Sequence, residues 1–73
     1  MKIYTIGHEE FEYDAYMGHV VVANNELEVR ELAKKVSVFE GEIVWETAKI
    51  EQHGDYTCHR TEPFILLSNY RAG

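Results

Sequence analysis

Residues 20–36 have the sequence VVVANNELEVRELAKKV, which decides the fold class because a strand signal runs directly into a helix signal. Three consecutive valines favour a β-strand, since their stiff β-branched side chains suit a pleated surface. Asn25 can then cap a helix, and Glu28, three residues later, can reach back towards the cap as in a capping box. The stretch therefore predicts a strand over residues 16–23, central in its sheet, followed at once by a helix.

The apolar residues of this helix fall at the spacing i, i+3, i+4 and i+7, which places them on one buried stripe: Val29, Leu32, Ala33 and Val36. Glutamates near the start and lysines near the end complement the helix dipole, and Glu31 with Lys35 forms a favourable i, i+4 pair. These small terms agree with one another, and they support an amphipathic helix packed on a sheet.

The segments on either side supply the remaining strands. Residues 2–6 alternate and predict a short first strand that Gly7 ends, and residues 8–14 are too rich in carboxylates for a core strand and predict a surface loop. Residues 43–50 favour a strand because Ile43, Val44 and Trp45 prefer extended structure, with a second helix as the alternative.

Turn and loop signals complete the chain. Gly54 and Asp55 predict a turn, and residues 56–62 a polar loop. Pro63 suits the start of an edge strand over residues 64–67, after which we expect residues 68–73 to form a mobile tail. The order strand, strand, helix, strand, strand predicts an α+β fold in one domain over residues 1–73: a four-stranded, mostly antiparallel sheet with one helix packed on one face.

Composition limits the class of protein. A chain of 73 residues with 45% hydrophobic residues can form one small core and is too apolar to be disordered. Its longest apolar run, residues 20–23, is far too short to span a bilayer, and no secretory signal follows Met1, so we expect a cytoplasmic protein. The single cysteine, Cys58, cannot form a disulfide within the chain.

The net charge of −6 is unevenly distributed. Residues 1–29 contain one basic residue, Lys2, against six acidic ones, whereas the remainder is nearly balanced. No basic stripe is present to neutralise phosphates, which disfavours direct binding to DNA or RNA and favours a protein partner with a basic surface.

Signals for catalysis and for bound metals are weak. His53, Cys58 and His59 lie close together, but their spacing matches no standard zinc pattern, and an ordinary solvated loop is the expected structure. Cys58 and His59, as neighbours on an extended segment, would point apart rather than form a nucleophile and base. No glycine-rich phosphate-binding motif is present. We therefore expect no enzymatic activity, no metal and no cofactor.

The most distinctive surface feature is a cluster of aromatic and acidic residues in the first loop. Aromatic side chains anchor interfaces, and carboxylates steer association with a basic partner. We expect the partner-binding residues to be Glu9, Glu10, Phe11, Glu12, Tyr13 and Asp14. The alternative is that Phe11 and Tyr16 belong to the core and the carboxylates only keep the protein in solution.

Two segments carry a resemblance to known proteins. VVVANNELEVRELA over residues 20–33 and ILLSNYRAG over residues 65–73 resemble the small strand-helix-strand proteins encoded by phages and prophages, although Asn69 interrupts the terminal pattern. Some small acidic proteins of this kind inhibit CRISPR or other bacterial defences by occupying a nucleic-acid-binding surface. The resemblance implies a phage accessory protein that acts in the host cytoplasm.

Three functional hypotheses follow. The first is a stoichiometric inhibitor that binds a basic surface of a nucleic-acid-targeting defence complex. The second is a self-associating module that forms a homodimer. Its sheet edge would pair with another copy because few lysines protect that edge. The third is a metal-binding protein built on His53, Cys58 and His59, for which those side chains would have to converge.

Overall fold

The computed structural model describes residues 1–10, 15–37, 40–57 and 59–71. Within them the chain forms four strands and two helices, in the order β1 (Lys2–Gly7), β2 (Ala15–Ala23), α1 (Glu26–Val36), α2 (Glu42–Thr47), β3 (Lys49–Asp55) and β4 (Phe64–Arg71). The mixed α+β fold class expected from the sequence is confirmed.

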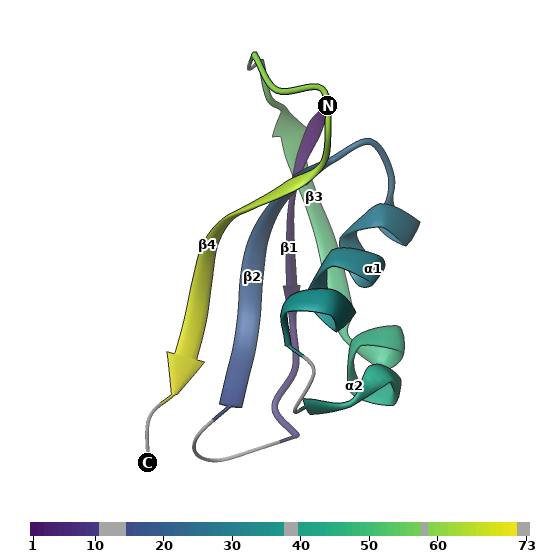
Figure 1. The fold of residues 1–73 in the computed structure, drawn as a ribbon, viewed down its shortest axis with the longest axis vertical. Helices are drawn as coiled ribbons and strands as arrows, with labels where there is room; N and C mark the ends of the chain where they lie inside the picture. Colours follow the sequence, from purple (N-terminus) through teal and green to yellow (C-terminus); the bar gives the residue numbers. More distant parts are fainter. Residues whose placement is uncertain (11–14, 38–39, 58, 72–73) are drawn as a thin grey trace.

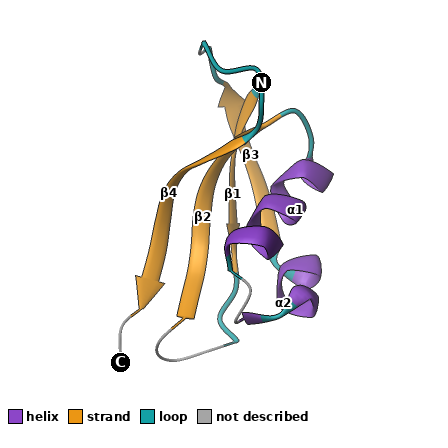
Figure 2. Ribbon diagram, in the orientation of Figure 1, coloured by secondary structure: helices purple, strands orange, loops and turns teal. Residues whose placement is uncertain are grey.

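The four strands form one antiparallel sheet in the order β3-β1-β2-β4. The strand over the valines, β2, is an interior strand as expected, and β3 and β4 are the edges. Both helices lie on the same side of the sheet (Figures 1 and 2), and no helix of the described residues covers its other face. The structure is therefore a two-layer arrangement, one layer of helices and one of strands.

The core lies between these layers. Tyr4 and Ile6 of β1 alternate inwards, and they pack with Val21 and Ala23 of β2 and with residues of both helices. In α1, Val29 and Ala33 are fully buried and Leu32 packs against the core, which confirms most of the expected stripe. Val36 departs from that expectation, since it is 44% exposed at the last turn of the helix.

The cap of α1 follows the sequence signal with one difference. The Asn25 side chain accepts a hydrogen bond from the Glu28 N–H at 3.0 Å, as an N-cap should. The Glu28 carboxylate instead accepts from the backbone N–H of Asn24 at 2.7 Å, one residue before the cap. The two bonds still satisfy two donors at the helix entrance, so the expected start of α1 is confirmed.

The preferred expectation of a strand over residues 43–50 is wrong up to Thr47, because Glu42–Thr47 forms the helix α2, so the helical alternative is confirmed and two helices rather than one cover the sheet. Gly41 enters this helix with φ +86°, a left-handed conformation that glycine adopts at little cost. At the other end, the Arg30 guanidinium donates to the carbonyls of Trp45 at 2.8 Å and of Ala48 at 2.9 Å. Contacts supplied by α1 thus stabilise a helix whose residues locally prefer a strand.

Two further expectations need correction near the C-terminal half. Gly54 lies within β3 beside a register shift rather than in a turn, and β3 begins only at Lys49. The last strand, expected over residues 64–67, continues to Arg71, so Ser68–Arg71 belong to the sheet rather than to a tail. β4 is longer than expected because the neighbouring strand β2 is nine residues long and pairs with it to its start, where Ala15 and Tyr16 pair with Arg71 and Tyr70.

Candidate functional site

The uncovered face of the sheet can be identified from the strand register. Directly opposed residues in antiparallel strands point to the same face. Tyr4 and Ile6 face the helices, so their neighbour Thr5 points the other way, together with its partner Val20 and with Leu67, which pairs with Val20. This face therefore includes apolar side chains from β2 and β4.

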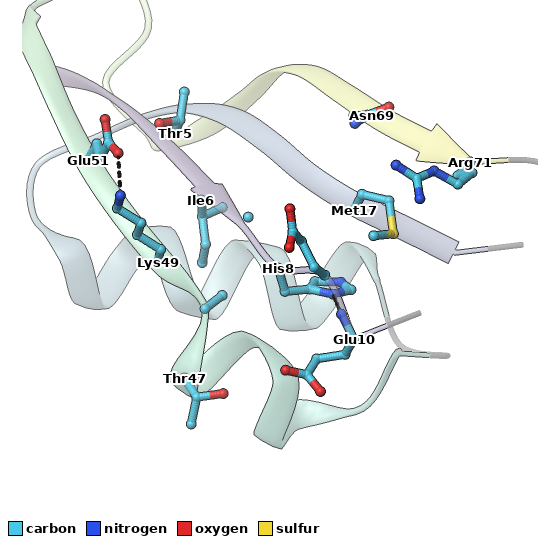
Figure 3. A pocket seen from close by; sticks show the side chains of 13 residues that line it. Thr5, Ile6, His8, Glu10, Met17, Thr47, Lys49, Glu51, Asn69 and Arg71 are labelled. Carbon is cyan, nitrogen blue, oxygen red and sulfur yellow. Dashed lines mark hydrogen bonds and ion pairs between the residues drawn. The ribbon is translucent and has the colours of Figure 1, made fainter. Parts of the chain in front are cut away.

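A depression of about 590 Å³ lies at the end of β1, and its lining extends from the strands to Thr47 and Ala48 at the end of α2. Figure 3 shows Asn69 and Arg71 of β4 on one side of it and Lys49 and Glu51 of β3 on the other. Met17 lies between them and is almost completely buried. The volume of this depression is in the range of binding sites for small ligands or for individual side chains of a partner.

Part of the expected partner-binding segment lines the same depression. Glu9 and Glu10 are both exposed and contribute to its lining. The Glu10 N–H donates to Nδ1 of His8 at 3.1 Å, and His8 Nε2–H donates to the carbonyl of Tyr16 at 2.7 Å, which holds the start of this loop against β2. The other expected contact residues, Phe11, Glu12, Tyr13 and Asp14, lie outside the described residues.

A second polar cluster is centred on His19, which is buried between the sheet and the helices. Its Nδ1 is hydrogen-bonded to Ser68 Oγ of β4 at 2.8 Å, and its Nε2 to Ser37 Oγ at the C-cap of α1 at 2.7 Å. Both ring nitrogens are satisfied, so this histidine connects an edge strand, an interior strand and a helix end.

Aromatic and acidic groups enclose this histidine. The ring centroid of Trp45 lies 5.1 Å from that of His19 and 4.8 Å from that of His8, and Tyr16 lies 5.3 Å from His19. Glu40 is also buried: its Oε1 accepts from the Tyr16 N–H at 2.6 Å, whereas Oε2 has no hydrogen-bond partner within the described part of the chain. Tyr16 therefore packs against the core, which agrees with the alternative that placed this residue in the core rather than in an interface.

The chemistry of this cluster differs from that of a hydrolytic serine site. In such a site the serine hydroxyl is bonded to Nε2 of the histidine, and a carboxylate accepts from the Nδ1–H and orients the ring as a base. Here Ser37 is bonded to Nε2, but the hydroxyl of Ser68 occupies the carboxylate's position at Nδ1, and the Glu40 carboxylate accepts from a backbone N–H instead. The arrangement suits a structural connection that ties β4 to the helical layer.

The pKa of His19 should make folding sensitive to acid. Burial lowers this pKa below its ordinary value of 6.5, the Glu40 carboxylate partly opposes the shift, and His8 adds to it. As pH falls below about 6.5, the unfolded chain binds a proton at this position more readily than the folded chain. We expect the free energy of unfolding to be largest above that pH and to decrease below it.

Urea denaturation at a series of pH values between about 8 and 5 measures this effect, because that range brackets the ordinary histidine pKa. In the variant His19→Gln, the free energy of unfolding should depend less on pH, because the contribution of His19 is removed. An equal dependence on pH in the two proteins would contradict the assignment to His19.

The residues considered for a metal site are not brought together by the described structure. His53 lies on β3, where its Nε2 is hydrogen-bonded to Thr5 Oγ1 at 2.8 Å, and His59 lies exposed in the loop before β4. Cys58 lies outside the described residues. Among the residues that are described, no three histidine, cysteine, aspartate or glutamate side chains are placed to hold a metal ion.

The sequence analysis missed the cluster of His19, Ser37, Glu40 and Ser68, of which the first three are buried. The only available signal for His19 was its place in β2, at an inward position of an otherwise apolar strand. Nothing local indicates its partners, which lie 18 and 49 residues away in the chain.

Comparison with known proteins adds no relative. No protein-family model matches the chain, no curated protein matches its sequence, and no solved structure matches its fold. Among the described residues, no helix has the length and apolar character needed to cross a membrane.

Proposed function

We propose that this chain is a protein-binding module that recognises a basic surface of its partner. The observation that carries the proposal is the position of Glu9 and Glu10, both exposed at a depression that is lined by the strands and by the end of α2. Basic side chains of a partner can meet these carboxylates while an apolar group reaches towards Met17. Such an arrangement gives both electrostatic steering and a desolvated contact.

The pairing of charges around the depression supports the acidic character of its rim. Lys49 is engaged by Glu51 at 3.1 Å, which leaves Arg71 as the other lysine or arginine in the lining. The next four residues of the loop, 11–14, add two more carboxylates by sequence. The proposal extends to a role as a stoichiometric inhibitor of a bacterial nucleic-acid-targeting defence complex, for which the support is the resemblance to small phage proteins.

The test is capture of partners from bacterial lysate by the immobilised chain. A variant with Glu9→Lys and Glu10→Lys should lose the specific partners, because like charges would then face a basic surface. The matched control, Glu31→Lys with Glu42→Lys, changes the net charge equally at exposed positions of α1 and α2.

We expect the control to retain the same partners, with capture that weakens as salt is raised. If the variant and the control retain the same partners with unchanged salt dependence, the proposed site is wrong. If both lose them equally, net charge alone explains the binding and the proposed site is again wrong.

A further inference from the structure

The two edges of the sheet differ in how they are protected against pairing. The β3 edge has the sequence KIEQHGD, whose charged side chains discourage contact with another strand. The β4 edge has the sequence FILLSNYR, with its only charge at the last position. Leu67 is 66% exposed, and Leu66 and Tyr70 are about half exposed. Each edge strand also carries one irregularity in its pairing, at His53 in β3 and at Leu66 in β4, so the two edges differ in charge, and β4 is the apolar one.

The distribution of charge indicates what covers this edge. The carboxylates of the two helices lie in the other layer, and β4 itself contains none, so a basic partner would find no complementary charge along this strand. A second copy of the chain would meet no facing carboxylates there either, in spite of the net charge of −6. The single cation, Arg71, lies at one end of β4 and the exposed Glu62 lies just before the other end.

We propose that β4 pairs antiparallel with β4 of a second copy about a twofold axis, which joins two four-stranded sheets into one of eight strands. Antiparallel pairing places Arg71 of each chain beside Glu62 of the other, so that both ends of the interface carry opposite charges. Leu66, Leu67 and Tyr70 lose contact with water there. This dimer goes beyond the proposed function, since neither Glu9 nor Glu10 takes part in it.

Sedimentation velocity over a range of concentrations tests the dimer. The wild-type chain should pass from monomer to dimer as concentration rises towards about 1 mM, the range of weak to moderate affinities. Leu67→Lys should raise the dissociation constant by about tenfold or more, because it places a lysine on each of the two paired strands. Gln52→Lys, at an exposed position of the opposite edge, should leave it unchanged. A wild-type chain that stays monomeric throughout, or equal effects of the two lysines, would overturn the proposal.

Exchange of charges identifies the orientation. Glu62→Arg and Arg71→Glu should each weaken the dimer by about tenfold, since each turns two attractive pairs into repulsive ones. The double variant should return close to wild-type affinity. If it is as weak as the sum of the single changes, the antiparallel pairing is wrong. Glu9→Lys with Glu10→Lys should leave dimerisation unchanged. The proposed dimer and the proposed binding of a basic partner are therefore tested by separate measurements.

Discussion

Replacement of Trp45 by alanine should lower the free energy of unfolding by about 3–5 kcal/mol, the cost typical of truncating a buried aromatic residue. Trp45 is completely buried and packs against the rings of His8 and His19. Its Nε1–H also donates to the carbonyl of Ser37 at 3.4 Å. The substitution leaves a cavity where the helical layer meets the sheet. Because small domains have total stabilities of only about 5–15 kcal/mol, the variant should be close to unfolding.

Urea denaturation followed by far-ultraviolet circular dichroism is the appropriate measurement, since the change removes the single tryptophan and its fluorescence. Trp45→Phe is the matched control: it retains most of the apolar volume and loses the N–H, and it should cost less than half as much as the alanine variant. A loss below about 1 kcal/mol for Trp45→Ala would mean that the residue is not part of the core, because that is less than truncation of a buried aromatic costs.

The strand and helix over residues 15–36 could be predicted from the sequence because their signals are local. The valines of β2, the cap at Asn25 and the apolar stripe of α1 each act within a few residues of one another. Residues 42–47 could not be predicted in this way. Their β-branched and aromatic residues favour a strand, whereas the helix is stabilised by the distant Arg30 and by burial of Trp45.

The same distinction separates the two candidate sites. The acidic rim at Glu9 and Glu10 was visible in the sequence because exposed charge is a property of composition, although its place beside β4 was not. The cluster around His19 depends on hydroxyl groups from a helix cap and an edge strand, which only the folded chain brings together. Long-range contacts of this kind leave no periodic signal in the residues that make them.

Glycine 18 provides the second large effect, through the close approach of two strands. Gly18 of β2 pairs with Gly7, the last residue of β1, where the two interior strands of the sheet meet without side chains. A Cβ atom at Gly18 would lie 2.8 Å from the carbonyl oxygen of Ile6, a backbone atom that cannot move without disturbing β1. A Cβ atom at Gly7 would lie 3.4 Å from the carbonyl oxygen of Met17, an ordinary contact distance.

Gly18→Ala should therefore lower the free energy of unfolding by about 1–3 kcal/mol, as overpacking does, because the strands must separate to accept the methyl group. Gly7→Ala, its partner across the ladder, should be neutral or more stable by up to about 1 kcal/mol, since alanine restricts the unfolded chain where the native backbone tolerates it. Thermal and urea denaturation of the two variants gives the comparison directly. Equal effects of the two substitutions would show that the paired strands do not approach each other more closely at Gly18 than at Gly7.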